Sequence, residues 1–166
     1  MLIRRLTPAD AGAARAVRLR ALREHPEAFA TSYEEERERD PAETARRLEP
    51  GPGQLTLGAF DDGRLVGTAT LTRSAKPKLL HRATLAAMYV APEARARGAG
   101  GALLEGVLET ARGWGVTDVG LAVTVGNAAA RRIYERAGFV AYGVEPRALR
   151  VDGRFHDVEL MCLRLA

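Results

Sequence analysis

Apolar residues in the first third of the chain recur in a pattern that predicts one short strand followed by helices. Residues 2–6 have strand character, and Thr7-Pro8 then marks a helix start, because threonine caps helices and proline is tolerated at their first position. Apolar residues at helical spacing continue to about residue 24, where His25-Pro26 interrupts the pattern. The pattern after this break predicts a helix over 26–39 and a short one over 40–48.

The rest of the chain alternates between strand and helix patterns. Asp61-Asp62-Gly63 is a hairpin signal between two of the strands. The expected strands are 54–60, 65–72, 82–90, 117–125, 139–150 and 154–165, and the expected helices are 99–113 and 127–137. This order predicts a mixed α/β domain of the α+β type, with about seven strands and about four helices. No repeat or linker divides the chain, so we expect a single domain over residues 1–166.

The stretch 85–104 has the composition of an anion-binding site. An apolar strand ends at Pro92, and a glycine-rich turn with Arg95 and Arg97 leads directly into a helix. The first backbone N–H groups of a helix have no partner inside it, and the helix dipole adds partial positive charge there. Glycine allows a phosphate to approach the backbone, and arginine supplies paired donors. The stretch therefore predicts a site for a phosphate-bearing ligand.

Two nucleotide motifs do not fit this turn. The P-loop pattern GxxxxGK[ST] is absent, and a dinucleotide fingerprint would need a glycine where Leu103 stands. The run Arg95-x-x-Gly98-x-Gly100 instead resembles the coenzyme A diphosphate signature of the GCN5-related N-acetyltransferase (GNAT) family. A second run, Asn127-x-x-Ala130-x-x-x-Tyr134-Glu135-x-x-Gly138-Phe139, resembles another motif of that family at the expected distance.

The resemblance implies a fold, a reaction and a set of coenzyme contacts. The fold is a central, mostly antiparallel twisted sheet that is splayed at the cofactor site. The reaction is direct attack of a primary amine on acetyl-CoA, with no metal, and backbone N–H groups of the central strand bind the acetyl oxygen. The implied coenzyme contacts are Met88, Tyr89, Val90, Arg95, Arg97, Gly98, Ala99, Gly100, Gly101, Ala102, Asn127 and Ala130.

Tyr134 is the candidate catalytic residue, acting as general acid toward the leaving thiolate. A phenol has a pKa of about 10 and a thiol one of about 8.5, so proton transfer is uphill by about 2 kcal/mol. The site must therefore lower the pKa of Tyr134 or use it as a hydrogen-bond donor only.

The sequence does not decide which residue is the general base. Removing the proton of a lysine-like amine at pH 7 costs about 4.6 kcal/mol. Residues 84–90 contain no Asp, Glu or His, although relatives often place the base there. The remaining alternatives are Glu34, Glu35, His156, Asp157 or a carboxylate acting through water.

The acceptor is expected beside the helices that follow the first strand. The resemblance implies that Phe29, Tyr33, Glu34 and Glu35 line the amine entrance, where carboxylates would attract a cation. The amine belongs to a small molecule, a peptide or a protein. The alternative from another class is a non-catalytic acyl-CoA-binding regulatory domain, against which the retention of Tyr134 argues.

Composition narrows the possible binding partners and cellular location of the protein. The net charge of +4 suits an anionic coenzyme, but the arginines are scattered and aromatic residues make up only 5%, which argues against nucleic acid as a partner. Cys162 is the single cysteine, so no internal disulfide forms. No segment has the length or hydropathy of a membrane span or signal peptide, which predicts a cytoplasmic protein. The oligomeric state stays open, a homodimer included.

Overall fold

The computed structural model, which describes residues 1–166, contains one seven-stranded sheet. The strands lie in the order β1-β2-β3-β4-β5-β7-β6, and every neighbouring pair is antiparallel except β4 and β5. Their bounds are β1 Leu2–Arg5, β2 Gln54–Asp61, β3 Arg64–Arg73, β4 Arg82–Val90, β5 Asp118–Thr124, β6 Val140–Val151 and β7 Arg154–Arg164. The expected mixed α/β fold with a mostly antiparallel sheet is thus confirmed.

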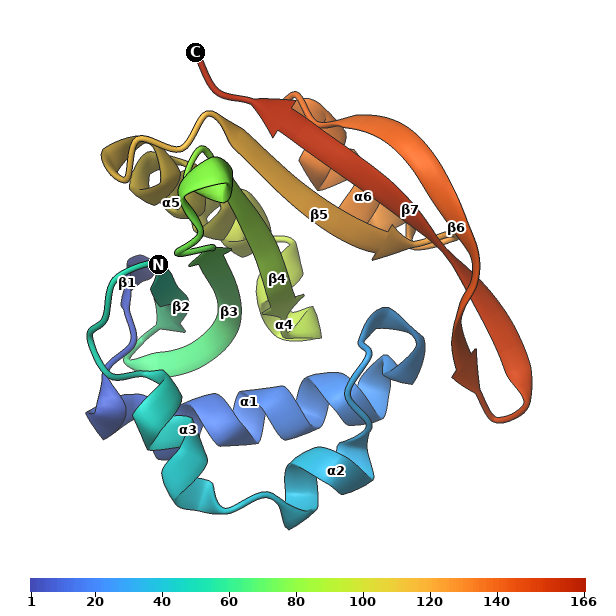
Figure 1. Ribbon diagram of the computed structural model, residues 1–166. Coiled ribbons are helices and arrows are strands. Elements are labelled where there is room, and N and C mark those ends of the chain that lie inside the picture. Colours follow the sequence, from blue (N-terminus) through green and yellow to red (C-terminus); the bar gives the residue numbers. More distant parts are fainter.

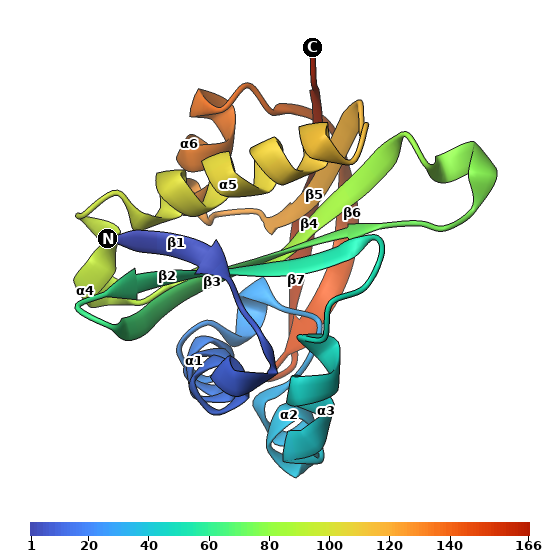
Figure 2. The ribbon, with the colours of Figure 1, turned by 90° about the vertical axis from the view of Figure 1, so that its left-hand side faces the viewer.

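Helices cover both faces of the sheet. The α-helices are α1 Ala11–Glu24, α2 Tyr33–Glu38, α3 Pro41–Arg47, α4 Pro92–Arg95, α5 Ala99–Gly113 and α6 Ala128–Arg136, with 3-10 turns η1 Pro8–Asp10, η2 Pro26–Ala28 and η3 Pro77–Leu79. Helices α5 and α6 lie on one face, and α1, α2 and α3 lie on the other (Figure 2). None of these helices has both the length and the apolar composition needed to cross a membrane.

The main hydrophobic core lies between the sheet and α5. Leu103 and Val107 of α5 are fully buried, as their helical spacing predicts, and they pack with Leu71 of β3 and Val119 of β5 in one cluster of 25 residues. This packing fixes the N-terminus of α5 against the end of β4.

The expectation of one helix over 26–39 was wrong. The chain makes the turn η2, runs extended at Phe29, and begins α2 only at Tyr33. Ser32 starts this helix by a capping box: its hydroxyl accepts the Glu35 N–H at 3.1 Å, and the Glu35 carboxylate accepts the Ser32 N–H at 2.8 Å. The break leaves η2 and Phe29 free to lie over the sheet.

Strands β4 and β5 part soon after they meet. Their parallel pairing covers only Arg82 to Thr84 on β4, and beyond it the two strands diverge (Figure 1). On its other edge β4 carries a bulge opposite Thr68–Thr70, with Ala87 at a φ of 51°. The bulge and the divergence together open the sheet beside Met88.

Candidate active site

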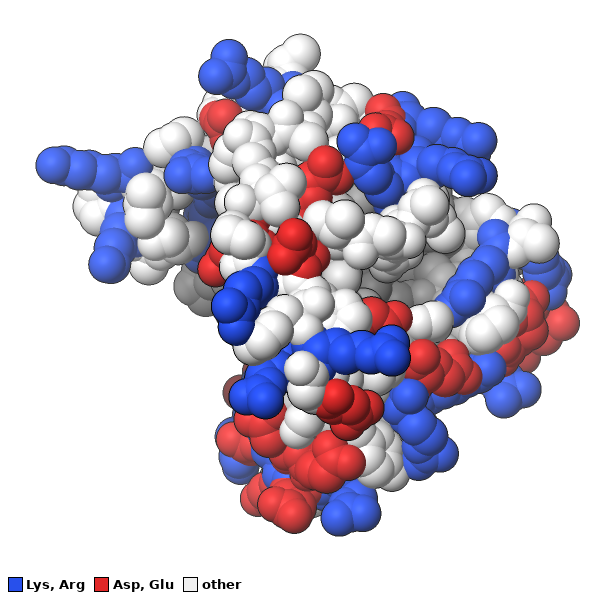
Figure 3. All heavy atoms as spheres, turned by 90° about the vertical axis from the view of Figure 1, so that its right-hand side faces the viewer, with Lys and Arg blue, Asp and Glu red and all other residues white.

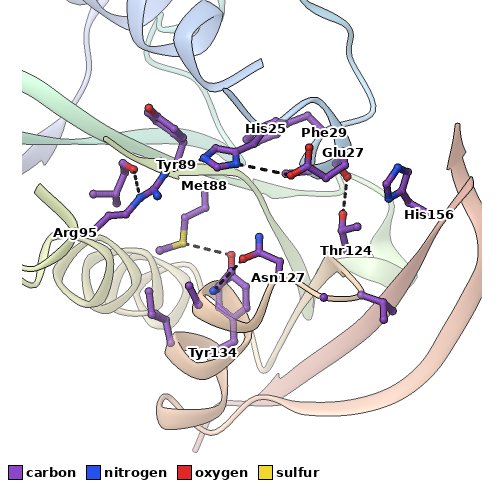
Figure 4. Close-up of a pocket in the computed structure, with 17 residues that line it drawn as sticks. His25, Glu27, Phe29, Met88, Tyr89, Arg95, Thr124, Asn127, Tyr134 and His156 are labelled. Atoms are coloured by element: carbon purple, nitrogen blue, oxygen red, sulfur yellow. Dashed lines mark hydrogen bonds and ion pairs between the residues drawn. The ribbon is translucent and has the colours of Figure 1, made fainter. Parts of the chain in front are cut away.

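A cavity of 480 Å³ lies where β4 and β5 diverge (Figure 4). Its walls come from the end of β4, the segment after β5, one face of α6, the turn η2 and the strand β7. Of the residues that the sequence analysis assigned to coenzyme or acceptor, the lining includes Met88, Tyr89, Val90, Arg95, Asn127, Ala130, Tyr134 and Phe29. The opening of the sheet thus brings together residues that stand more than 100 positions apart in the chain.

Helix α6 presents Asn127, Ala130 and Tyr134 to the cavity. The Asn127 side-chain oxygen accepts the Ala130 N–H at 3.2 Å and so caps the helix. Tyr134 lies two turns along the same face, and its ring packs edge-on against Phe139 at 5.8 Å. Its hydroxyl is directed at the Met88 sulfur, 3.5 Å away. Burial raises the pKa of Tyr134 to about 12, so its phenol stays protonated.

The end of β4 is tied to α1 and α4 by a chain of polar contacts. The Tyr89 hydroxyl donates to the Glu24 carboxylate at 2.7 Å, and Arg20 joins Glu24 to Glu93 through bonds of 2.7 to 3.0 Å. The pKa of Tyr89 is raised, mainly by its burial and also by its hydrogen bond to Glu24. The Tyr89 hydroxyl therefore stays a donor and holds the strand end in place.

The Arg20–Glu93 pair predicts an acid-dependent loss of stability. Hydrogen bonding from Arg20 lowers the pKa of Glu93 from 4.5 to about 2, so the pair stabilises the fold above about pH 4.5 and this contribution disappears as the pH falls toward 2. The melting temperature of Glu93→Gln should lie below that of the wild type at pH 7, and the gap should close between pH 4.5 and 2. Glu49→Gln, at an exposed glutamate without an ion pair, is the control in the same thermal titration. A gap that stayed constant with pH would contradict this assignment.

A groove of 520 Å³ adjoins the cavity at the start of α5. Gly98, Gly100 and Gly101 line it, and Arg95 and Ile133 line both the groove and the cavity. The first backbone hydrogen bond of this helix runs from the Ala102 N–H to the Gly98 oxygen, at 3.1 Å. The N–H groups of residues 98–101 therefore have no backbone acceptor. Gly98 stands in the left-handed region at a φ of 78°, and nothing lies within 4 Å of a Cβ added at Gly98 or Gly101. This open turn suits the diphosphate of a coenzyme.

The two motif arginines occupy different surroundings. Arg95 bonds to the Val90 oxygen at 3.0 Å and reaches across the wall between groove and cavity. Arg97 forms an ion pair with Asp61 at the end of β2 and lines neither space. Ala99 and Ala102 of the same turn do not line the groove: Ala99 is fully buried in the core, and Ala102 is half-buried.

The acceptor candidates on α2 lie outside the cavity. Glu35 caps its own helix, and the Tyr33 hydroxyl accepts from Arg23 at 2.7 Å. Glu34 is exposed on the same helix and does not line the cavity. Of the four residues expected at the amine entrance, only Phe29 lines the cavity.

Among the cavity residues that the sequence did not predict, two are ionisable, namely His25 and Glu27. They stand on either side of Pro26, in a segment that was interpreted as a helix break and a helix start. The turn η2 is held over the cavity because the buried Thr124 hydroxyl donates to the Glu27 backbone oxygen at 2.7 Å. Nothing in the local sequence around Pro26 marked either residue as part of a site. Of the residues expected as bases, His156 lines the cavity, whereas the Asp157 carboxylate accepts the Arg147 N–H.

The charge around the site is mixed. The face shown in Figure 3 is hollowed, and the floor of the hollow is uncharged while basic and acidic side chains stand around its rim. Ten of the 17 residues that line the cavity are hydrophobic. The mostly apolar lining suits an uncharged ligand segment, and the charged side chains stand near the rim.

Comparison with known proteins identifies the family. The sequence model of the Acetyltransferase (GNAT) family matches residues 19–139. An uncharacterised N-acetyltransferase of Mycobacterium tuberculosis is 34% identical over 113 residues, which are 68% of each chain. An L-methionine sulfoximine/L-methionine sulfone acetyltransferase of Pseudomonas aeruginosa is 35% identical over 78 residues, 47% of this chain and 45% of that protein.

Solved structures agree with this assignment. A GNAT-family acetyltransferase of Streptococcus pneumoniae has a TM-score of 0.82 and 27% identity, covering 99% of both chains. An acetyltransferase from Salmonella typhimurium, solved with acetyl-CoA, shares the fold at a TM-score of 0.87 and 24% identity, covering 100% of this chain and 94% of that one. The chain therefore belongs to the GNAT family of acetyl-CoA-dependent N-acetyltransferases.

Proposed function

We propose that this chain transfers the acetyl group of acetyl-CoA to the primary amine of a small molecule, within the cavity between β4 and β5. The observation that carries the proposal is the continuity of two spaces: the groove at the open helix start and the cavity share Arg95 and Ile133 as lining residues. A ligand with a diphosphate at one end and a thioester at the other could occupy both.

The coenzyme is proposed to lie along this path in three parts. Its diphosphate meets the free N–H groups at the start of α5 beside Gly98, Gly100 and Gly101. Its pantetheine arm runs past Asn127 and Ala130 to the end of β4, where backbone N–H groups of Met88 to Val90 polarise the acetyl oxygen. Arg97, Ala99 and Ala102 support the turn rather than line the groove.

Tyr134 is proposed to donate a hydrogen bond to the leaving sulfur. Transfer of its proton to a thiolate with a pKa of about 8.5 would be uphill by about 5 kcal/mol when the phenol has a pKa of about 12. A hydrogen bond to the developing negative charge needs no such transfer and is worth about 1.5–3 kcal/mol. The raised pKa thus favours the second of the two roles that the sequence left open.

The acceptor is proposed to enter beside η2, under the hairpin of β6 and β7. Phe29 offers an apolar surface there, and the half-buried Glu27 carboxylate attracts an ammonium group. The Pseudomonas relative named for two amino-acid analogues supports an acceptor of small size. A solved neighbour from Brucella melitensis, 27% identical, is named a ribosomal-protein-alanine N-acetyltransferase, so peptide N-termini form the second class to test.

A thiol-release assay tests this proposal. Purified protein is incubated with acetyl-CoA and a panel of amines, namely amino acids and their sulfone and sulfoximine analogues, polyamines, and peptides with free N-termini. We expect release of free CoA with small amines and a matching mass gain of one acetyl group in the acceptor. Binding of acetyl-CoA without turnover on any amine would favour the regulatory, acyl-CoA-binding alternative.

A further inference from the structure

Arg95 connects the coenzyme groove to a histidine in the cavity. It lies at the end of α4, lines both spaces, and bonds to the Val90 oxygen. The far side of its guanidinium meets the Nε2 atom of His25 at 2.9 Å. On its other side the His25 ring faces Glu27, with 3.7 Å between Nδ1 and the carboxylate oxygen. Figure 4 shows these three residues in a row along one wall of the cavity.

The contact with Arg95 defines the tautomer of His25. A guanidinium has only donors, so Nε2 must accept this hydrogen bond with its lone pair. The imidazole proton then stands on Nδ1, which lies 3.7 Å from the Glu27 carboxylate, too far for a hydrogen bond. The lone pair stays on Nε2, which is therefore the nitrogen that accepts a proton when histidine works as a general base.

We propose that His25 is the catalytic base of the acetyl transfer and that Arg95 covers its basic nitrogen until the coenzyme diphosphate binds the guanidinium. The inference rests on the proposed function. Arg95 can serve either space, because its side chain lines both. An incoming diphosphate offers a guanidinium two charges and paired acceptors, which a neutral imidazole does not. The base is thereby exposed only when the coenzyme is bound.

In the chemical step, the amine nitrogen bonds to the acetyl carbon, and the carbon–sulfur bond breaks with its electron pair on sulfur. The proton that the amine loses goes to Nε2 of His25, while the leaving thiolate accepts a hydrogen bond from Tyr134. Glu27 stabilises the imidazolium that forms, and solvent later removes its proton.

The charged and titratable groups near His25, taken from each element packed around it, are consistent with this role. Glu24 of α1 precedes it, but that carboxylate is already engaged by Tyr89 and Arg20. The Tyr89 ring of β4 lies 6.3 Å from the imidazole. Glu27 is therefore the carboxylate that faces His25, and Arg95 is the cation that does so. His156 lines the same cavity from β7, but no hydrogen bond fixes its tautomer.

The first arm of the test needs coenzyme but no acceptor. Nitrogen-15 NMR of the histidine-labelled protein, with the His25 signals assigned through His25→Gln, should show a protonated Nδ1 and a hydrogen-bonded Nε2 in the free protein. Saturating CoA should move the Nε2 signal toward that of a nitrogen without a donor. Arg95→Met should give this shifted signal without CoA. A His25 signal that CoA leaves unchanged, in protein shown by calorimetry to be loaded, would overturn the inference.

The second arm measures turnover against pH. With acetyl-CoA saturating, His25→Gln should lose about 10²- to 10⁴-fold in kcat at pH 7, together with the acidic limb of the wild-type profile. His81→Gln, on an exposed loop before β4, should keep both. Wild-type turnover in His25→Gln, or loss of the limb in His156→Gln instead, would overturn the inference and leave the proposed function standing. Absence of turnover in the wild type would count against the proposed function. The NMR arm would still show whether the coenzyme releases His25 from Arg95.

Discussion

Replacing Gly101 by valine should weaken the binding of acetyl-CoA by about 100-fold without unfolding the protein. Gly101 lines the groove at the start of α5, and its backbone N–H has no acceptor in the structure. A valine side chain would project into the space proposed for the diphosphate. Loss of two charge-assisted hydrogen bonds at about 1.5 kcal/mol each corresponds to about a factor of 100 in the dissociation constant. Isothermal calorimetry with acetyl-CoA measures this change.

Gly101 is a better position for this test than its neighbours. A side chain at Gly98 would be strained by the φ of 78°, and a Cβ at Gly100 would stand 3.0 Å from the Ile133 side chain, which would have to shift. Around Gly101 nothing lies within 4 Å, and a non-glycine residue should favour the helix slightly. Gly113→Val is the matched control, because it places the same side chain in open space at the far end of the same helix. Equal affinity in both variants would refute this placement of the diphosphate.

The elements that carry the coenzyme motifs could be predicted from the sequence almost to the residue. Strand 82–90 and helix 99–113 were expected with these bounds and are found with them. The reasons are local: proline ends the strand, glycine forms the turn, and Leu103 and Val107 give the helix a continuous apolar face that becomes the core. Such signals do not depend on distant parts of the chain.

The acceptor side could not be predicted in the same way. Residues 26–39 contain helix-forming glutamates, which favoured one helix, but the Ser32 capping box starts a new helix and the Thr124 hydroxyl holds η2 down onto β5. That second contact joins residues 97 positions apart, so no local pattern contains it. For the same reason, His25 and Glu27 gave no signal of a site, and the reach of Arg95 from turn to cavity depends on how α1 packs beside α4.

Replacing Tyr134 by phenylalanine should lower kcat by about 10- to 150-fold and leave acetyl-CoA affinity nearly unchanged. The substitution keeps the ring and its edge-on packing against Phe139, and it removes only the hydroxyl that is directed at the Met88 sulfur. The expected loss corresponds to one hydrogen bond of about 1.5–3 kcal/mol to a developing thiolate, which exists in the transition state but not in the bound thioester. Steady-state kinetics and calorimetry measure the two quantities separately.

The nature of the leaving group separates this role from a purely structural one. An acetyl thioester of a more acidic thiol develops a weaker hydrogen-bond acceptor on sulfur, so the loss caused by Tyr134→Phe should shrink with that donor. Tyr142→Phe is the control, because Tyr142 is 63% exposed on β6 and lines neither space. A loss of the same size with both thioesters would reduce Tyr134 to a packing residue. A loss of affinity with kcat intact would assign its hydroxyl to the coenzyme arm, because only an interaction made equally in the ground state and the transition state leaves the turnover number unchanged.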